Sequence, residues 1–396
     1  MDLLSTGTTP DIFSAMTPQT AQTDSLSKDA LSKGIDLYAQ KKYDEAIREF
    51  RRSIGLAPFS EYSINASDYM AQAYLQIDDV EGAVNAYKNS IQLNPFLDAT
   101  YISLGNLYFS EGRYEEAEKQ FEEAVKVNPS TNNRYSLGQV YLITNRLDEA
   151  EKQFIEVDRL GPDKPSGKFG LGQTYSKQGR YEKAIDHFEQ AIRLQGDLYD
   201  AYAEIGYAYA DLGEMDEAQE IVDFLEKESP VLADVLSRYM YKVDPPKIMF
   251  AHSSSTFLYT LPRKTPVSFL DGYLAAADTS KSFTMIFQFN KEMDRASVED
   301  RFNWSIKRSS STGPGEAYNF GQPVPETEAK IALFPDSVYY DADTFTATVR
   351  FRVHQNSEVN ATIDPSHVEF QFRGKDEYGL TINSQWDQYT GFHGVA

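Results

Sequence analysis

The chain has 396 residues, of which 41% are hydrophobic and 25% charged, and its formal net charge is −22. This composition is typical of a folded protein of two or three domains. The negative charge counts against nucleic acid and anionic membranes as partners, because both are bound through Lys and Arg. The absence of cysteine excludes disulfides, thiolate metal ligands and thiol nucleophiles.

Residues 1–26 are rich in Thr, Ser, Pro and Gln and show little periodicity, which predicts a flexible N-terminal arm. They lack the basic start and apolar stretch of a Sec-type signal, and no apolar run in the chain reaches the length of a membrane span. We therefore expect a cytoplasmic protein. The alternative is an exported or cell-surface bacterial protein in which this arm acts as a non-cleaved export signal.

Residues 27–243 contain a repeat of about 34 residues. Each unit has a small residue, an alanine twelve residues later, aromatic residues at fixed offsets, and a proline near its end. The small residues are Gly34, Ala71, Gly105, Gly138, Gly172 and Gly206, with spacings of 37, 34, 33, 34 and 34 residues. Small residues allow two helix backbones to approach closely where they cross.

This signature resembles the tetratricopeptide repeat family. Six consecutive units follow it over residues 27–232, with three departures: Gly196 replaces a proline, Val222 replaces an aromatic, and an insertion at 61–63 widens the first spacing. A single helix pair cannot bury its apolar face alone, whereas a stack of pairs can. We therefore predict an all-α, right-handed superhelix over 27–243, with a capping helix at 231–240.

The resemblance implies a concave groove lined by the second, fifth, ninth and twelfth positions of each unit. Carboxamides alternate there with single aromatics, which suits a segment of a partner protein. The predicted partner-binding residues are Asn65, Asp68, Gln72, Asn106, Phe109, Asn132, Tyr135, Gln139, Phe169, Gln173 and Tyr207. An alternative is that Phe109, Tyr135 and Phe169 only pack against the next repeat.

The groove positions indicate the charge of the partner. None of those in repeats two to six is basic, which argues against the basic clamp that some members of the family use for a C-terminal carboxylate. Residues 1–245 carry a net charge of −18, against −4 for the remainder. A neutral or basic segment is therefore the expected ligand, although much of the charge belongs to a solvated outer face.

Residues 247–396 form a second predicted domain, after Asp244-Pro245-Pro246. Strands are predicted at 247–251, 256–261, 283–290, 303–307, 330–334, 344–354 and 368–373 from period-two alternation. About seven strands suggest an all-β, immunoglobulin-like sandwich. The segments 287–298 and 376–380 resemble the F-S-x-P-M-D-x-x-S-V segment and the D-x-x-G turn of bacterial Ig-like domains found in surface-layer and adhesin-type proteins. A loop is expected at 309–327.

Sites for catalysis and metal binding are not predicted. The five histidines form no i,i+4 pair, and P-loop and G-x-S-x-G motifs are absent. The G-x-x-G-x-G spacing at Gly167, Gly170 and Gly172 indicates helix packing. Asp336, Asp341 and Asp343 have ligand chemistry suited to Ca²⁺, but turn-forming aspartates are the commoner explanation.

These observations predict a non-enzymatic scaffold or adaptor. It binds a protein or peptide segment in the repeat groove, uses the Ig-like domain as a second docking module, and needs no cofactor. We expect no nucleic-acid partner and no membrane insertion, and the sequence is also compatible with a homo-oligomer. The alternatives are a structural or export-linked component of a bacterial cell-surface or appendage assembly and, less favoured, an enzyme.

Overall fold

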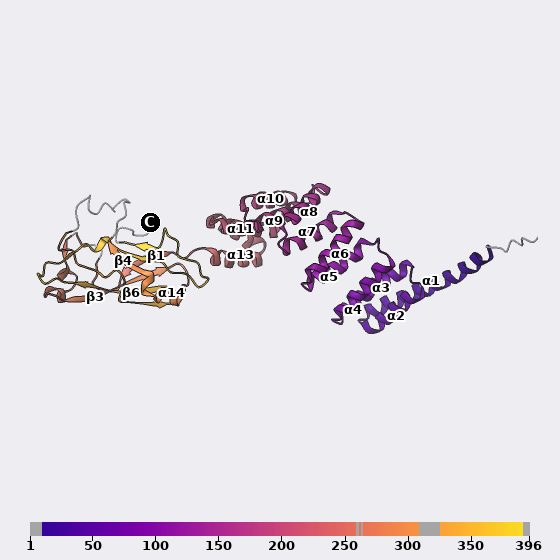
Figure 1. Cartoon of the computed structure of the whole chain (residues 1–396), viewed down its shortest axis with the longest axis horizontal. Coiled ribbons are helices and arrows are strands. Elements are labelled where there is room, and N and C mark those ends of the chain that lie inside the picture. Colours follow the sequence, from indigo (N-terminus) through magenta and orange to yellow (C-terminus); the bar gives the residue numbers. More distant parts are fainter. Residues whose placement is uncertain (1–9, 259–260, 263, 309–324, 391–396) are drawn as a thin grey trace, which may run out of the picture. The chain divides into compact units, whose positions relative to one another are not determined.

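A computed structural model describes residues 10–258, 261–262, 264–308 and 325–390 (Figure 1). The chain divides into two compact units, Met1–Ser237 and Arg238–Ala396. The division falls within the last helix of the helical part, ahead of the boundary that we expected at 244–246.

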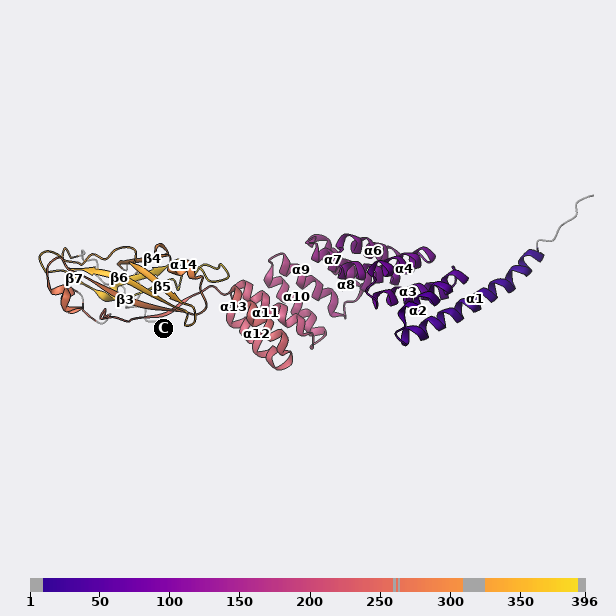
Figure 2. The same ribbon diagram turned by 90° about the horizontal axis from the view of Figure 1, so that it is seen from below.

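The first unit is a series of helix pairs, stacked one after another in Figure 2. From α1 to α12, each helix packs against its neighbours along the chain, and alternate helices also touch, as α5 does α7, and α9 both α7 and α11. The helices are α1 (Pro10–Ala39), α2 (Tyr43–Leu56), α3 (Glu61–Leu75), α4 (Val80–Leu93), α5 (Asp98–Ser110), α6 (Tyr114–Val127), α7 (Thr131–Ile143), α8 (Leu147–Leu160), α9 (Pro165–Lys177), α10 (Tyr181–Leu194), α11 (Tyr199–Leu212), α12 (Met215–Glu228) and α13 (Pro230–Val243).

The periodic small residues lie where the two helices of a repeat cross. A Cβ atom added to Gly105 would lie 2.5 Å from the ring of Phe121, and the same close approach joins Gly172 to Phe188. Both rings are almost fully buried. In the last repeat Val222 replaces the ring, and Leu236 of α13 fills the space beside Gly206 instead. The capping helix therefore compensates for the departure at Val222.

The N-terminal helix begins earlier than we expected. α1 starts at Pro10, so the prediction of a flexible arm was wrong for residues 10–26, whereas residues 1–9 lie outside the described part of the chain. Ser27, the first residue after the predicted arm, fastens this helix to α2: its buried hydroxyl donates to the carbonyl of Ser53, at 3.0 Å.

An array of charge and aromatic contacts repeats on the loops that join the two helices of a unit. The guanidinium carbons of Arg113, Arg146 and Arg180 lie 4.5, 4.5 and 4.6 Å from the ring centres of Tyr108, Tyr141 and Tyr175, respectively. Arg146 also reaches Glu118 of the preceding repeat at 2.5 Å. The Arg–Tyr contacts therefore lie within one repeat, whereas the Arg146–Glu118 ion pair links neighbouring repeats.

The second unit contains antiparallel sheets. The largest has the order β1-β3-β6-β5, and a second has the order β4-β8-β9; β2 and β7 form a short two-stranded pair. The strands are β1 (Ile248–Ser253), β2 (Thr265–Pro266), β3 (Ser280–Phe289), β4 (Trp304–Arg308), β5 (Ser337–Asp341), β6 (Thr346–His354), β7 (Thr362–Ile363), β8 (Val368–Phe372) and β9 (Gln388–Tyr389), with a short helix α14 (Arg295–Glu299).

The two larger sheets share one hydrophobic core. Phe287 of β3 contacts Trp304 of β4 and Phe370 of β8, with ring centres 5.0 and 5.4 Å apart. The predicted alternation in β3 is confirmed, because Phe283, Met285, Phe287 and Phe289 are all buried. The apolar positions of β6 are buried in the same way.

Some strand predictions were wrong. The segments predicted at 256–261 and 330–334 form no extended strand in the described residues, whereas the aspartate-rich stretch 336–343 contains β5. There Asp336 accepts a hydrogen bond from Arg352 Nε at 2.9 Å. Charged residues occur in β5 because it lies at the edge of its sheet, where it pairs only with β6 among the described strands. Their presence made this strand look like a turn in the sequence. Most of the predicted loop at 309–327 lies outside the described residues.

The two segments that resemble Ig-like motifs meet in the structure. Lys291, from the first, is 1% exposed, and its Nζ lies 2.7 Å from Asp376 Oδ2 of the second. The ammonium also donates to the carbonyls of Tyr241 and Asp244, at 2.5 and 2.9 Å. The rings of Tyr241 and Tyr378 flank it. Within the second unit, the buried lysine therefore fixes the backbone of residues 241–244 to the segments that carry the ion pair.

Candidate functional site

The first helices of the repeats carry the predicted partner-binding residues. We define the first-helix surface as the predicted groove positions of α3, α5, α7, α9 and α11. Four of the carboxamides on this surface are exposed: Asn65, Gln72, Asn106 and Asn132. They point to solvent and are available to a ligand.

The aromatic residues of the first-helix surface lie partly against the second helix of their own repeat. Tyr135 packs on Phe154, and Phe169 packs on Phe188, each with ring centres 5.6 Å apart. Phe109 contacts Tyr114 at 5.4 Å. All three remain half-buried. One side of each ring therefore packs within its own repeat, whereas the packing alternative placed these contacts with the next repeat.

Three successive first helices are joined by a row of hydrogen bonds. Gln139 of α7 donates through Nε2 to Oε1 of Gln173 in α9, at 3.1 Å. The side chain of Gln173 also acts on Glu204 of α11, in the direction that lowers the pKa of its carboxyl. At the other end, Gln139 contacts the hydroxyl of Tyr135. We call these four residues the polar row.

Glu204 is the functional candidate that the sequence analysis missed. It is half-buried, and burial raises the pKa of its carboxyl, with the charge of Asp200 acting in the same direction. Glu204 lies one position beyond the fifth position of its unit, so the family pattern did not include it. The available signal was the i,i+4 spacing from Asp200, which places two carboxylates on one helix face.

Tyr207 lies next to this acidic pair. Burial raises the pKa of its hydroxyl, and the charge of Glu204 raises it further. At the opposite end of the repeats, Asp68 of α3 accepts a hydrogen bond from Ser90 of α4 at 3.2 Å, and burial raises its pKa. Partly buried carboxyl groups thus lie on α3 and α11, the first and last of these five helices.

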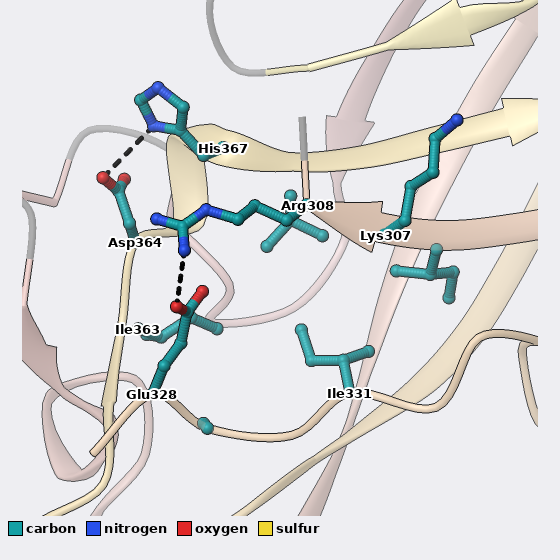
Figure 3. A pocket seen from close by; sticks show the side chains of 10 residues that line it. Lys307, Arg308, Glu328, Ile331, Ile363, Asp364 and His367 are labelled. Atoms are coloured by element: carbon teal, nitrogen blue, oxygen red, sulfur yellow. Dashed lines mark hydrogen bonds and ion pairs between the residues drawn. The ribbon is translucent and has the colours of Figure 1, made fainter. Parts of the chain in front are cut away.

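The second unit contains a small pocket, with a volume of about 140 Å³, lined by the end of β4, the start of β8 and residues from 328–331 and 363–367 (Figure 3). Arg308 forms an ion pair with Glu328 at 2.9 Å, and Nδ1 of His367 lies 3.1 Å from Asp364. Figure 3 shows the two pairs side by side at the pocket wall. The sequence analysis missed this pocket because its charged residues come from separate segments.

The described lining of this pocket contains a histidine paired with a carboxylate. A histidine held by a carboxylate is two parts of a catalytic triad, but none of the ten residues described as lining the pocket carries a hydroxyl or thiol. The acidic and basic side chains also offset one another there. Elsewhere in the described ranges, no cluster of three or more His, Asp or Glu side chains is arranged to hold a metal ion.

Membrane insertion receives no support from the helices that the structure describes. None of them is both long and apolar enough to cross a bilayer.

Comparison with known proteins identifies the repeats. Models of the family described as tetratricopeptide repeat match residues 99–131, 166–198 and 199–222. The small glutamine-rich tetratricopeptide repeat-containing protein 2 of Mycosarcoma maydis is 30% identical over 99 residues, which is 25% of this chain and 27% of that protein. The STIP1 homolog of Dictyostelium discoideum is 30% identical over 101 residues, or 25% of this chain and 17% of its own. The chain therefore spans about a quarter or less of these relatives.

Solved structures similar to this chain include a MamA protein, at 23% identity and a TM-score of 0.38, covering 43% of this chain and 94% of that one. PilF of Pseudomonas aeruginosa has 18% identity and a TM-score of 0.43, with 55% and 99% covered. A tetratricopeptide repeat protein of Parabacteroides merdae has 14% identity and a TM-score of 0.48, with 56% and 90% covered. Together with the family models, the helix pairs and their spacing establish that the first unit of this chain contains tetratricopeptide repeats.

Proposed function

We propose that the chain is a non-enzymatic scaffold whose repeats bind a segment of a partner protein on the first-helix surface. The observation that carries the proposal is the polar row, in which Gln139 and Gln173 are held by each other and by their neighbours. Glutamine side chains donate and accept hydrogen bonds, so a fixed row of them suits a peptide backbone. The row is already ordered, which reduces the entropy lost on binding.

The remaining surface supplies side-chain contacts. The exposed faces of Tyr135 and Phe169 offer apolar area next to the row, and Asn106 and Asn132 extend the polar contacts toward the N-terminal repeats. Partial packing of the aromatic rings holds them in place without covering them. The family match supports a protein-binding role, since repeats of this kind present extended surfaces to partners.

The test compares two variants of the full chain. Gln139→Ala with Gln173→Ala removes the centre of the polar row, and Gln219→Ala removes an exposed glutamine of α12 that bonds only within its own helix, to Asp223 at 2.8 Å. Proteins co-purifying from the native source are quantified for each. We expect the double variant to lose specific partners that the control keeps. Equal recovery by both variants would show that binding takes place elsewhere.

The second unit is proposed to be an Ig-like docking module. Its strand order supports this: β1-β3-β6-β5 and β4-β8-β9 correspond to the ABED and CFG sheets of constant-type immunoglobulin domains. Trp304, at the start of the third strand of that scheme, is buried as in such domains. Deletion of the unit is expected to remove a subset of partners and leave those bound to the repeats. If deletion leaves the set of partners unchanged, the second unit acts only as a spacer.

A further inference from the structure

We infer that the β5 edge of the four-stranded sheet is a pairing site for a second copy of this chain, and that α14 keeps this edge closed. The inference concerns the second unit alone and does not depend on the proposed function. It rests on the hydrogen bonds that two side chains of α14 make with the backbone of β5, together with the strand register at that edge.

The backbone of β5 has one side that β6 does not use. In an antiparallel pair, the backbone groups of successive residues point alternately toward the partner strand and away from it. The N–H and C=O groups of Tyr340 point away from β6, because both are bonded to α14. Val338, two residues earlier, presents its backbone groups to the same side. This side therefore carries the groups with which a further strand would pair.

α14 supplies to Tyr340 what a neighbouring strand would supply. Nη1 of Arg295 donates to the carbonyl of Tyr340 at 2.9 Å, and Oε1 of Glu299 accepts from its N–H at 3.1 Å. The two side chains also form an ion pair with each other, at 3.1 Å. A residue of a pairing strand offers the same one donor and one acceptor. Arg295 and Glu299, which we call the α14 cap, therefore occupy the place of an added strand.

The helix that carries the α14 cap is fixed by other contacts. Val298 is buried, and its carbonyl accepts a hydrogen bond from Nε1 of Trp304 at 2.9 Å. Asp294 accepts from the N–H of Ser297 at 2.6 Å, which fixes the first turn. Because these contacts do not involve the α14 cap, replacing its two side chains opens the β5 edge and leaves the helix in place.

The side chains of β5 favour a second copy as the occupant. Val338, Tyr339 and Tyr340 have high β propensity, and Tyr339 is 61% exposed. When an edge pairs antiparallel with the same edge of another copy, the contact has two-fold symmetry and must be complementary to itself. Residues 337–340 carry no charged side chain, so two copies meet there without repulsion between like charges.

The experiment measures sedimentation velocity of the full chain over a range of concentrations. Arg295→Ala with Glu299→Ala is the open-edge variant. Arg352→Ala with Asp336→Ala is the control, because it removes an exposed ion pair of 2.9 Å from the same sheet and leaves the α14 cap intact. A third variant adds Val338→Pro to the open-edge variant. Proline there removes an N–H that faces away from β6, so it blocks pairing without loss of a bond to β6.

We expect the open-edge variant to self-associate at least about ten-fold more tightly than wild type and the control, and the added Val338→Pro to restore wild-type behaviour. Tryptophan fluorescence during urea unfolding checks that the second unit is folded in each variant. A folded open-edge variant that sediments like wild type would overturn the inference. Association that persists after Val338→Pro would also overturn it, since another surface would then carry the contact. If the open-edge variant retains foreign proteins from a lysate without self-associating, the second copy is the wrong occupant.

Discussion

The buried Lys291–Asp376 pair makes a quantitative prediction about the second unit. Lys291→Met keeps the length and apolar volume of the side chain but removes its charge, leaving the carboxylate of Asp376 in a fully buried site. Breaking a buried ion pair on one side costs about 3–5 kcal/mol. Asp376 keeps hydrogen bonds from the backbone amides of Tyr378 and Leu380, at 3.0 and 2.8 Å. We therefore expect the lower end, about 3 kcal/mol.

The assay uses the position of the tryptophans. The chain has two, Trp304 and Trp386, and both lie in the second unit. Their fluorescence during urea unfolding reports on this unit within the full chain, while circular dichroism at 222 nm reports on the helices. With a denaturant slope of about 2 kcal/mol per molar urea, the loss corresponds to a midpoint lowered by about 1.5 M.

Two further variants define the control and the pairwise energy. Lys281→Met breaks an ion pair with Asp271 on the same unit, at 3.2 Å, whose lysine is 43% exposed, and the expected cost is below about 1 kcal/mol. Lys291→Met combined with Asp376→Asn removes both charges and should recover part of the loss. A fluorescence midpoint for Lys291→Met no lower than that for Lys281→Met would refute the assignment of a buried, energetically important pair.

Three other predictions concern the repeats. Gly167→Ala should destabilise the helical unit by about 1–3 kcal/mol, because the new Cβ would lie 2.5 Å from a backbone nitrogen of α8. The control Gly55→Ala has open space around the new Cβ and should be neutral or stabilising by up to about 1 kcal/mol. Urea unfolding followed by circular dichroism at 222 nm compares the two variants. Glu204→Gln should raise the melting temperature near neutral pH but not below about pH 4. Burial raises the pKa of Glu204 from its ordinary 4.5, so the folded chain binds this proton more tightly than the unfolded chain does. The wild type therefore loses stability as the pH rises from the unfolded pKa to the higher folded pKa. An equal melting temperature at neutral pH would contradict the burial cost. Arg146→Ala should lower the free energy of unfolding by about 0.5–1 kcal/mol, because it removes the contact with the ring of Tyr141. Burial and nearby glutamates raise the pKa of Tyr141 to about 12. High salt should reduce the difference in unfolding free energy between wild type and variant only in part.

The sequence alone predicted the features that repeat locally. The period of about 34 residues and the fixed offset from Gly105 to Phe121 or from Gly172 to Phe188 reflect a crossing that each helix pair must make, so the pattern recurs along the repeats, with Val222 as the departure in the last one. Alternation in β3 and β6 likewise records which side chains face the core. The periodicity of buried positions is a local property, so it can be recognised in a single sequence without comparison to others.

Only the tertiary structure decided which distant residues meet. Glu204 interacts with Gln173, one helix pair away, and Lys291 contacts Asp376 and the end of α13, which lie far from it in the sequence. β5 is a strand because it pairs with β6 at the sheet edge, although its aspartates suggested turns. Hydrogen bonds and ion pairs between distant segments leave no period in the sequence, since each depends on one side chain rather than on a face. The fold was therefore largely predictable from local patterns, whereas the electrostatic detail of the candidate site was not.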